Sequence, residues 1–394
     1  MSEHVSGTYN HITSPLGDFE RSIIGHIPPG GNWKNIPLEI KDKRIDSIRA
    51  TGGRTTYYGR LHPSRPSYTI NTFFSRTGNG CFIHPHQDRL ISQREAARLQ
   101  SFPDDFVFQG PKTSIYKQIG NAVPPLLGRA FGELIQPKEF IDLFAGAGGL
   151  SRGLEMVGAE CKLAVEYQKH MCTTFQANHD VDANRVLCED LNSANLKEIF
   201  APYKGIDLVC GGPPCQGFSL AGKCLSDDPR NHLVRQFIKV IEIVRPNYLL
   251  MENVKGLVWF SKGQVLSEIM EAFRKLGYNV KHKVMKAIEF GVPQKRERVF
   301  VLGTLKNTPI EFPNPIFSYD DSSLPLPISV DEAISDLLEL EIGGGTNELT
   351  PYNSNQPSAY QKLMRGMINF NEFLEQRDNN LMPRYKRKSI QLRL

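Results

Sequence analysis

Between residues 139 and 305, hydrophobic and polar positions follow a repeating order. Short apolar runs end in glycine, proline or a carboxylate, and most are followed by a stretch in which apolar residues recur every three or four positions. Short apolar runs are typical of buried strands, and the longer period is typical of helices with one buried face. Strands that alternate with helices predict an α/β fold with a doubly wound, mostly parallel sheet.

The individual elements can be assigned from these runs. Strands are predicted within 139–144, 161–168, 185–191, 206–214 and 248–254, with a closing strand pair at 278–287 and 298–305. Helices are predicted within 151–159, 231–245 and 264–277, and before residue 139 only 91–102 and 124–136 carry a clear helical pattern. The two ends of the chain, 1–80 and 305–394, lack a sustained period and are expected to be irregular.

Composition excludes several classes of protein. Of the 394 residues, 40% are hydrophobic and 23% are charged, and no apolar run reaches the length of about 18 residues that spans a membrane. The first residues are polar and lack the basic start and apolar stretch of a secretory signal, so we expect a cytoplasmic protein. The seven cysteines are irregularly spaced, which indicates free thiols rather than a disulfide framework.

No metal site is expected. Cys210, Cys215 and Cys224 form the only close group of cysteines, but no CxxC pair or spaced histidine pair accompanies them. Most of the other thiols sit beside apolar residues. The cysteines expected to be small core residues are Cys161, Cys172, Cys188 and Cys210.

Charge is distributed unevenly along the chain. The net charge is +5 and the isoelectric point is about 8.7, which permits a polyanionic partner without requiring one. Basic residues concentrate in 41–49, 294–298 and 383–394, whereas 307–350 is acidic and rich in proline. This distribution suggests a one-sided charge, and the basic run at the C-terminus is expected to be a solvated extension rather than an arm that binds a polyanion.

A glycine-rich turn, DLFAGAGG, lies between the first predicted strand and its helix. Open parallel sheets bind their ligands at such a turn, although this one departs from the dinucleotide fingerprint. Gly146, Gly148 and Gly149 let the backbone approach a ligand closely, while Phe144 offers an aromatic face. The same glycines could instead serve tight packing of the helix.

Carboxylates end the next two predicted strands. Glu166 can accept both hydroxyls of a ribose, and Asp190 can take an adenine amino group, although each residue could individually be a helix cap. Three such strand ends in order favour a nucleoside cofactor that lacks a pyrophosphate. S-adenosyl-L-methionine fits this description.

Cys215 follows the fourth predicted strand, in the sequence DLVCGGPPCQGFSLAG. A Gly-Gly-Pro-Pro turn would hold this loop open at the carboxyl edge of the sheet, a position that favours a nucleophile over a buried filler. Glu252 and Asn253 are expected just beyond the fifth strand, where a carboxylate is often a cap instead. Arg296 and Arg298 are expected on one strand face, either ready to bind an anion or forming a solvated edge.

Together these residues closely resemble the motifs of the DNA cytosine-5 methyltransferase family. The resemblance rests on DLFAGAGGLSRG, the strand ends at Glu166 and Asp190, GGPPCQGFS, MENV and QKRER, and it extends to RLISQREAARLQSFPDDF and QIGNAVPP. A Pro-Cys pair followed by Gln, with ENV and QxRxR at the distances typical of the family, makes it specific. It implies a Rossmann-like fold of the S-adenosylmethionine-dependent methyltransferase type, with a small irregular target-recognition domain.

The resemblance also implies a role for each residue of the site. Cys215 would add to carbon 6 of a flipped-out cytosine, while Glu252 would hydrogen bond or protonate ring nitrogen 3. Arg298 would hold the base carbonyl, Arg296 the neighbouring phosphate or the active-site loop, and 216–222 would close over the base. The residues implied for binding S-adenosylmethionine are Phe144, Ala145, Gly146, Gly148, Gly149, Glu166, Asp190, Leu191, Pro214, Leu233, Asn121 and Val123.

The order of the motifs departs from the family's usual order. Segments 88–108 and 118–125 resemble motifs that normally lie at the carboxyl end, yet here they precede the first motif. The chain is therefore expected to be circularly permuted, with its final helix packed beside the first strand. The predicted domains are a catalytic domain at 81–304 and a target-recognition domain divided between 1–80 and 305–394.

The resemblance implies that the protein methylates carbon 5 of cytosine in a short specific sequence of double-stranded DNA. Two alternative functions remain. One branch of the family methylates transfer RNA, but it carries a Cys-Phe-Thr tripeptide that this sequence lacks. The second alternative is a catalytically silent scaffold that keeps the fold and binds nucleic acid. The presence of all four residues implied for catalysis argues against it: Cys215, Glu252, Arg296 and Arg298. We expect a monomer, cytoplasmic and associated with the nucleoid, that protects host DNA from a partner restriction endonuclease without forming a stable complex.

Overall fold

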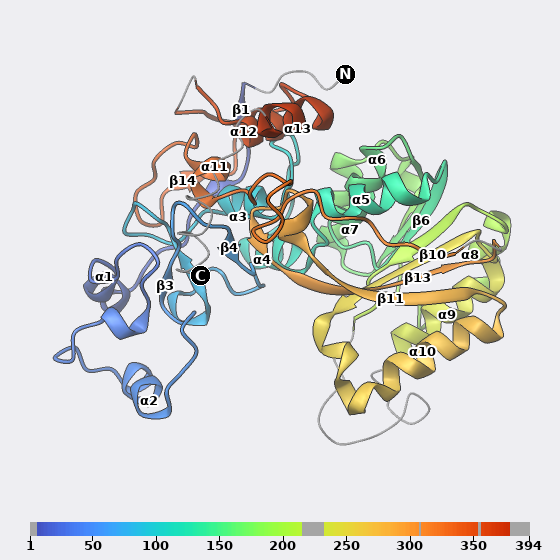
Figure 1. The fold of residues 1–394 in the computed structure, drawn as a ribbon, viewed down its shortest axis with the longest axis horizontal. Coiled ribbons are helices and arrows are strands. Elements are labelled where there is room, and N and C mark those ends of the chain that lie inside the picture. Colours follow the sequence, from blue (N-terminus) through green and yellow to red (C-terminus); the bar gives the residue numbers. More distant parts are fainter. Residues whose placement is uncertain (1–5, 215–231, 307–308, 354–355, 379–394) are drawn as a thin grey trace. The chain divides into compact units, whose positions relative to one another are not determined.

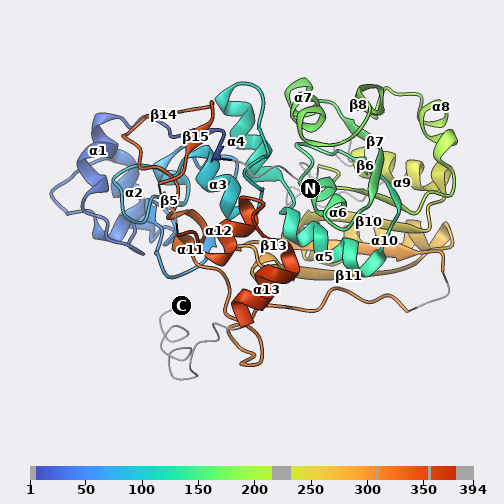
Figure 2. The same ribbon diagram turned by 90° about the horizontal axis from the view of Figure 1, so that it is seen from above.

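The computed structural model describes residues 6–214, 232–306, 309–353 and 356–378. The chain divides into two compact units, whose elements are labelled in Figures 1 and 2. Among the described residues, no helix is both long and apolar enough to cross a lipid bilayer. Unit 1 consists of Met1–Asn121, Ala287–Arg296 and Pro315–Leu394, and unit 2 consists of Ala122–Lys286 and Glu297–Asn314.

Seven strands form the sheet of unit 2. They are β6 (Glu139–Leu143), β7 (Glu160–Glu166), β8 (Val186–Cys188), β9 (Leu208–Gly211), β10 (Tyr248–Val254), β11 (Asn279–Lys286) and β13 (Glu297–Thr304). Their order is β11-β13-β10-β9-β6-β7-β8. The strands from β10 to β8 in this order pair in parallel, whereas β13 pairs antiparallel with both β10 and β11. This mostly parallel sheet confirms the predicted fold class.

Helices cover both faces of the sheet. Those of unit 2 are α5 (Pro125–Ile135), α6 (Gly149–Glu155), α7 (Lys169–Asn178), α8 (Leu196–Phe200), α9 (His232–Val244) and α10 (Gln264–Lys275). In Figure 1, α5 and α6 lie on one side of the sheet and α9 and α10 on the other. Alternating strands and helices of this kind are the arrangement that the apolar pattern predicts.

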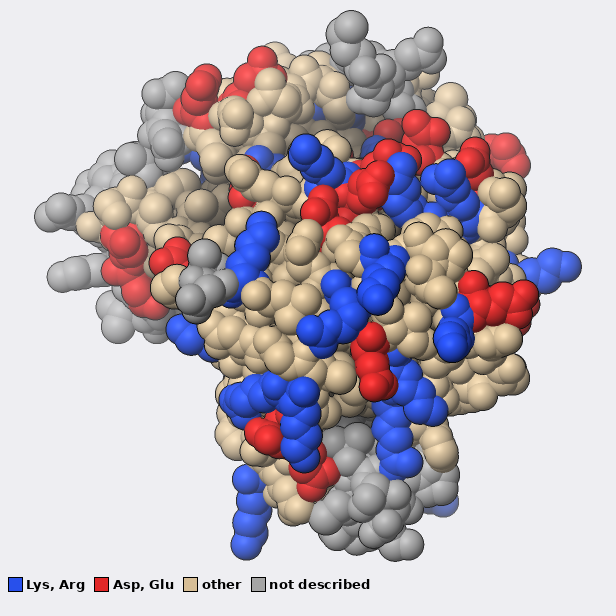
Figure 3. All heavy atoms as spheres, turned by 90° about the vertical axis from the view of Figure 1, so that its right-hand side faces the viewer, with Lys and Arg blue, Asp and Glu red and all other residues tan. Residues whose placement is uncertain are grey.

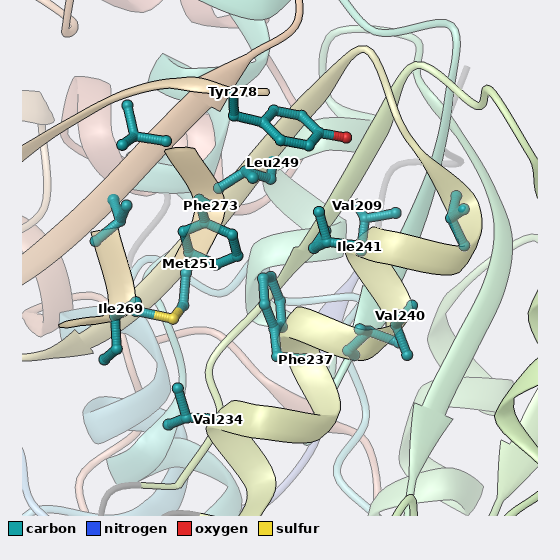
Figure 4. Close-up of a cluster of buried hydrophobic side chains, with 14 of the residues drawn as sticks. Val209, Val234, Phe237, Val240, Ile241, Leu249, Met251, Ile269, Phe273 and Tyr278 are labelled. Carbon is teal, nitrogen blue, oxygen red and sulfur yellow. The ribbon is translucent and has the colours of Figure 1, made fainter. Parts of the chain in front are cut away.

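An apolar core lies between the sheet and the helices α9 and α10 (Figure 4). Phe237, Val240, Ile241 and Val244 of α9 are all buried, and their spacing of three or four residues places them on one helix face. Each such side chain stabilises the fold by about 1.5–3 kcal/mol relative to exposure. The side chains that face them include Val209, Leu249, Met251, Ile269, Phe273 and Tyr278.

Some local predictions for unit 2 are wrong. Glu252 and Asn253 lie inside β10 rather than beyond it, because pairing with β13 continues along the whole strand. Asp190 lies two residues beyond β8, which ends at Cys188. Cys188 is exposed rather than part of the core, because β8 is an edge strand with β7 as its one neighbour in the sheet. The other three cysteines expected in the core are buried.

Unit 1 pairs short strands from distant parts of the sequence. β1 (Gly7–Thr8) pairs with β15 (Thr350–Pro351), and β2 (His11–Ile12) pairs with β14 (Gly345–Thr346). β3 (Gly59–Arg60) pairs with β5 (Cys81–Ile83), and β4 (Ser67–Tyr68) pairs with β12 (Gln294–Lys295). The first two ladders join the beginning of the chain to the region that follows residue 315.

Short helices complete unit 1. They are α1 (Asp18–Ile24), α2 (Lys43–Thr51), α3 (Gln93–Leu99), α4 (Lys112–Asn121), α11 (Val330–Ile334), α12 (Ala359–Met364) and α13 (Phe370–Asp378). The prediction of only two helices before residue 139 is therefore wrong. The missed helices have few buried apolar side chains, as in α2, where the buried residues are Ile45 and Ile48, so no apolar period stands out. Caps help to fix their ends: Asp42 accepts the backbone N–H groups of Arg44 and Ile45 at the start of α2.

Charged side chains are buried inside unit 1. Arg98 of α3 has no exposed surface and pairs with Asp104 at 2.6 Å and with Asp336 at 2.7 Å. Arg365 pairs with the same Asp336 at 2.5 Å. Burial works to raise the pKa of Asp336, but the charge of Arg98 and the hydrogen bonds from both arginines outweigh it and lower this pKa. We call these four residues the Arg98 cluster; it ties α3 to the segment around α11 and α12.

Candidate active site

The carboxyl ends of β6 and β9 lie side by side near the middle of the sheet. The chain continues from β6 to β7 on one side and from β9 to β10 on the other. Neighbouring strands after which the chain turns in opposite directions form a topological switch point, where open α/β sheets bind their ligands. The glycine-rich turn at 144–149 and the segment 212–214 both begin at this edge.

The backbone of the glycine-rich turn is left-handed at Phe144 (φ 58°), Gly146 (φ 58°) and Gly148 (φ 90°). A Cβ on Gly148 would lie 2.1 Å from Nε2 of His179, so packing requires a glycine there. In the part of the chain that the structure describes, a Cβ on Gly146 would meet no atom within 4 Å. Both interpretations of the glycines therefore apply: Gly148 permits close packing against His179, and Gly146 leaves open space beside the backbone.

Glu166, the last residue of β7, is linked to this turn. Its carboxylate accepts the N–H of Gly146 at 3.0 Å and the N–H of Gln168 at 2.9 Å. The residue is 7% exposed, and burial raises its pKa although these hydrogen bonds act in the opposite direction. Each carboxylate oxygen has a second lone pair, so the side chain keeps the capacity to accept ribose hydroxyls.

Asp142 is a buried carboxyl group on β6 that the sequence did not single out. Ser151 of α6 donates its hydroxyl to Asp142 at 2.6 Å, so this contact connects the strand before the turn to the helix after it. Burial raises the pKa of Asp142 to about 7, although the hydrogen bond from Ser151 lowers it. A single aspartate within an apolar run does not reveal from the sequence that it is buried. The one hint in the sequence was its position two residues before Phe144.

Two other predicted cofactor residues lie in different surroundings. Asp190 is exposed, and its carboxylate accepts the N–H of Asn192 at 2.9 Å, which is the kind of capping contact that the sequence left open. Ala145 donates its N–H to the carbonyl of Val165 at 3.2 Å. The turn is thus tied to β7 through its backbone as well as through Glu166.

The remaining predicted cofactor residues are dispersed. Leu191 is buried, and Leu233 is half-buried in the first turn of α9. Pro214 is the last residue described before 215–231. Asn121 is the exposed last residue of α4 in unit 1, and Val123 is buried in unit 2. Gly149 is the buried first residue of α6.

Glu252 and Arg298 form an ion pair on adjacent strands. Nε of Arg298 lies 3.0 Å from Oε1 of Glu252, with 16% and 11% of the two side chains exposed. Burial lowers the pKa of Arg298, and the carboxylate of Glu252 opposes this shift. The structure therefore brings together two of the predicted catalytic residues in a site that solvent still reaches.

Asn253 fixes the neighbouring loop. Its side-chain amide donates to the carbonyl of Pro213 at 3.0 Å, so the segment after β9 is anchored to β10 beside Glu252. A Cβ on Gly212 would lie 3.0 Å from Oε2 of Glu252, which shows how closely this segment approaches the carboxylate. Cys215 and the rest of its predicted loop, 216–222, lie outside the described residues.

Arg296 lies apart from Arg298. It falls between β12 and β13, where the chain leaves unit 1 for unit 2, so the prediction that both arginines share one strand face is wrong. Only 1% of Arg296 is exposed, and its guanidinium donates to the carbonyls of Ile70 and Gly120, both at 3.0 Å. These contacts are those of a residue that holds backbone segments together.

Gln294 makes similar contacts, and the sequence gave it no role of its own. It is fully buried; its Oε1 accepts the N–H of Ile70 at 2.9 Å, and its Nε2 donates to the side chain of Gln100 at 2.9 Å. The only available signal was its place two residues before Arg296, in the motif QKRER. Gln294 and Arg296 thus hold the two peptide groups that flank the Cα of Ile70.

The sequence profile of the family described as C-5 cytosine-specific DNA methylase matches residues 1–137 and 138–391. The chain belongs to this family. M1.HphI of Haemophilus parahaemolyticus, a Type II methyltransferase, is 42% identical over 181 residues, which cover 45% of this chain and 48% of that protein. The Type II methyltransferase M.AquIA of a Picosynechococcus strain is 40% identical over 191 residues, covering 45% of this chain and 76% of that protein.

A longer alignment joins the chain to the Type II methyltransferase M.DdeI of Desulfomicrobium norvegicum, with 35% identity over 233 residues. It covers 57% of this chain and 54% of M.DdeI. The matched part thus spans about half the length of M1.HphI and M.DdeI. Among solved structures, a putative DNA modification methyltransferase encoded within an E. coli prophage is 28% identical over 57% of this chain and 63% of that chain, with a TM-score of 0.41.

Membership of the C-5 cytosine-specific DNA methylase family makes S-adenosylmethionine the cofactor, and the geometry fits it. Gly146 leaves open space at the switch point, Phe144 is half-buried and offers a ring, and Glu166 retains acceptor capacity at the same turn. An aromatic face, a carboxylate and an open backbone together suit a nucleoside.

Proposed function

We propose that the protein methylates carbon 5 of cytosine within a short specific sequence of double-stranded DNA. The observation that carries this proposal is the Glu252–Arg298 pair, held on adjacent strands beside the anchored segment that leads to Cys215. Family membership and the names of the Type II relatives support DNA over RNA as the substrate. When bound, S-adenosylmethionine supplies the methyl group that carbon 5 of the cytosine takes.

The chain's own residues then have distinct tasks. The Cys215 thiolate adds to carbon 6 of a flipped-out cytosine, forming a carbon–sulfur bond and making carbon 5 electron-rich. Glu252 hydrogen bonds or protonates ring nitrogen 3, which takes up the charge that develops on the base. Arg298 orients Glu252 and holds the base carbonyl. Loss of the carbon 5 proton and cleavage of the carbon–sulfur bond then release 5-methylcytosine and the thiolate.

Arg296 has a different task in this proposal. Its guanidinium already donates to two backbone carbonyls, so we assign it a positioning role rather than direct contact with a phosphate. For the cofactor, we assign the ribose to Glu166 and the adenine to Phe144, with Asp190 as the acceptor for its amino group.

Transfer of tritium from labelled cofactor to DNA or RNA tests the proposal directly. Wild type is expected to label unmodified plasmid DNA and not transfer RNA. Cys215→Ser is expected to abolish labelling while cofactor binding, measured by equilibrium dialysis, is retained, because a hydroxyl is a far poorer nucleophile than a thiolate near neutral pH. Labelling of RNA alone, or substantial turnover by the serine variant, would contradict the proposal.

We infer in addition that the family's motifs are circularly permuted in this chain. α5 packs against α6, and a Cβ on Gly153 of α6 would lie 2.3 Å from the carbonyl oxygen of Pro125. Phe131 of α5 contacts Phe300 of the sheet with ring centroids 4.5 Å apart. α5 therefore packs against α6, which follows the glycine-rich turn of the family's first motif. The chain passes from α5 to β6, the strand before that turn, in three residues.

The permutation also has a direct test. A chain that starts at Lys138, runs to Asp378 so that α13 is kept, and continues through a flexible linker from Gly7 to Gln136 would restore the usual order. It is expected to fold and to methylate the same sites as wild type. Loss of activity in this chain, with truncation after Asp378 alone shown to be harmless, would count against the permutation and against a target-recognition domain divided between 1–80 and 305–394.

The biological setting is part of the same proposal. Because the relatives are named Type II methyltransferases, we propose that the protein protects host DNA from a restriction endonuclease of the same specificity and acts as a cytoplasmic monomer on the nucleoid. Bisulfite sequencing of DNA from cells that express the protein identifies the site, and sedimentation velocity measures the oligomeric state.

A further inference from the structure

We propose that Cys172 and Cys188 form a dithiol site, which a hydroperoxide such as hydrogen peroxide oxidises to a disulfide, and that this disulfide lowers the affinity for S-adenosylmethionine. We call these two residues the thiol pair. The effect on the cofactor rests on the proposed assignment of the ribose to Glu166. Formation of the disulfide does not depend on that assignment.

The fold of unit 2 brings the two thiols together from different elements. Cys172 lies in α7 and Cys188 is the last residue of β8; α7 packs against β8, and Figure 2 shows the two next to each other. The thiol of Cys172 donates to the carbonyl of Glu166 at 3.2 Å, and the thiol of Cys188 donates to the carbonyl of Tyr167 at 3.7 Å. Both sulfur atoms therefore lie at consecutive carbonyls where β7 ends.

The two thiols also contact each other. Burial raises the pKa of Cys172, and a hydrogen bond with the thiol of Cys188 raises it further. Cys188 pairs with Glu166 in the sheet, and Cys172 reaches the carbonyl of the same Glu166. Joining the two sulfur atoms therefore requires rotation of the two side chains and no change in the register between β7 and β8.

Exposure gives each member of the thiol pair a different role. Among the five cysteines of the described ranges, Cys188 is exposed and the other four are buried, with Cys172 at 3% exposure. An accessible thiol beside a second thiol is typical of redox-sensing cysteines, whose disulfides are transient in reducing compartments. Cys188 is thus the thiol that meets the oxidant, and Cys172 is the thiol that completes the disulfide.

The oxidation takes two steps. The sulfur of Cys188 attacks one oxygen of hydrogen peroxide; a sulfur–oxygen bond forms, the oxygen–oxygen bond breaks, and the thiol proton leaves with hydroxide as water. The sulfur of Cys172 then attacks the sulfur of this sulfenic acid; the disulfide bond forms, the sulfur–oxygen bond breaks, and a second water takes the proton of Cys172. Two electrons pass from the two thiols to the peroxide.

The charged surface of the molecule points to no comparable site. On the face in Figure 3, the described Lys and Arg side chains are interspersed with Asp and Glu, so charge alone marks no further site for an anion or a cation there. Hydrogen peroxide is uncharged and needs no patch of one sign. An exposed thiol with a second thiol beside it is sufficient for this reactant.

Oxidation would act on the residues assigned to the cofactor. The carbonyl of Glu166 accepts the thiol of Cys172, while the carboxylate of Glu166 accepts the N–H of Gly146 in the glycine-rich turn. A disulfide has no thiol hydrogen, so the end of β7 loses one of the contacts that fix this carboxylate. Asp190, assigned to the adenine amino group, follows Cys188 by two residues and moves with it. The disulfide therefore weakens cofactor binding from behind the pocket.

Treatment of the reduced full-length chain with hydrogen peroxide tests the proposal. The chain carries Cys215→Ser, which removes the nucleophilic thiol from the reaction with peroxide and is expected to retain cofactor binding. Peptide mapping by mass spectrometry without reductant should identify a peptide that links Cys172 to Cys188. The dissociation constant for S-adenosylmethionine should rise about three- to tenfold, the range for loss of one hydrogen bond, and dithiothreitol should restore it.

Single substitutions in the same chain separate the two roles. Cys188→Ser should make cofactor affinity insensitive to peroxide, and serine replaces this exposed residue without a loss of packing. Cys172→Ser should stop the reaction at a sulfenic acid on Cys188, which dimedone labels. Cys161→Ser is the matched control, because Cys161 is a buried cysteine of β7 whose loss should leave the response to peroxide unchanged.

The possible failures are distinguishable. Absence of the linked peptide would overturn the thiol pair and leave the proposed function standing. A linked peptide with unchanged cofactor affinity would overturn the effect on the cofactor. If Glu166→Ala binds S-adenosylmethionine as wild type does, the ribose assignment fails and the effect on the cofactor fails with it, whereas the linked peptide still decides whether the thiol pair forms a disulfide.

Discussion

Unit 2 encloses an apolar cluster around Phe237 and Ile241, whereas unit 1 encloses Arg94 and Arg98, neither of which has any exposed surface. Arg94 donates to three backbone carbonyls, at 2.6–3.0 Å, and Arg98 pairs with two aspartates. Unit 2 also has a nearly buried ion pair, Glu252–Arg298, but this pair keeps 11–16% of its side chains exposed. Buried charged groups in unit 1 are therefore closed off from solvent, whereas the ion pair in unit 2 stays within its reach.

The difference follows from the elements that each unit contains. A seven-stranded sheet satisfies its own backbone and presents two apolar faces, so helices can cover both of them with apolar side chains alone. Unit 1 consists of short strands and helices, whose ends leave backbone carbonyls without regular partners. Buried guanidinium groups supply donors to those carbonyls. Charge therefore stabilises the fold of unit 1, whereas in unit 2 we expect it to act in catalysis.

The largest expected effect tests this division in unit 2. Glu252→Gln should lower kcat for methyl transfer about 10²–10⁴-fold, because the side chain loses its proton-transfer role. The melting temperature should change little, because the amide still accepts a hydrogen bond from Arg298. Glu133→Gln is the matched control, since Glu133 also pairs with an arginine at 2.6 Å in unit 2 but on the surface of α5. Global unfolding by Glu252→Gln would show that the pair is structural after all.

The next effect tests unit 1. Asp336→Ala should reduce the free energy of unfolding by about 3–5 kcal/mol, because Arg98 and Arg365 would lose the carboxylate that they share. Fluorescence of Trp33, in a chain where Trp259 is replaced by phenylalanine, monitors unit 1 during urea unfolding. Asp46→Ala removes an exposed pair with Arg49 and should cost less than about 1 kcal/mol. Equal losses in the two variants would contradict the structural role of the Arg98 cluster.

Two buried aspartates should respond to pH with opposite signs. The pKa of Asp336 is lowered in the folded state, so its contribution to stability is present above the unfolded pKa of about 3.9 and is lost as pH falls through the folded value. The pKa of Asp142 is raised to about 7, so the folded state holds a proton that the unfolded chain releases. Its contribution declines as pH rises from about 3.9 to 7, by about 1.4 kcal/mol per pH unit.

Hydrogen exchange measured peptide by peptide separates these two dependences. Asp142→Asn should remove the loss of protection in unit 2 between pH 4 and pH 7, because an amide does not titrate. Asp336→Asn should remove the loss of protection in unit 1 on acidification, although it also weakens the cluster at neutral pH. A pH dependence of the same sign in both units would refute the assignment.

The smallest expected effect concerns the cofactor turn. Phe144→Ala should weaken S-adenosylmethionine binding by about 1 kcal/mol, because it removes a ring on which the adenine stacks. Calorimetric titration of the cofactor measures this change, and Glu166→Ala should weaken binding as well. Phe73→Ala, an exposed phenylalanine in unit 1, should leave it unaffected. Wild-type affinity in both unit 2 variants would show that the pocket lies elsewhere.

The sequence predicted unit 2 better than unit 1. β6, β7, β9, β10 and α9 lie where their apolar runs place them, because burial against a sheet imposes a regular period. The helices α1, α2 and α4 were missed because few of their side chains are apolar and buried; in α2 these are Ile45 and Ile48. In the site, Glu252 and Arg298 were named from their motifs, but their pairing depends on the register between β10 and β13.

By itself the sequence determined the α/β class, the position of the glycine-rich turn, the place of Glu166 at the end of its strand, and the motifs that identify the family. These features are local, because each depends on a short run of residues and on its own backbone. Only the tertiary structure decided that Arg98 and Asp336, which are 238 residues apart, share a buried ion pair, and that Arg296 faces backbone carbonyls rather than solvent. From the sequence alone, a buried arginine cannot be told from one on the surface. Its burial and its hydrogen-bond partners come from residues that only the fold brings next to it.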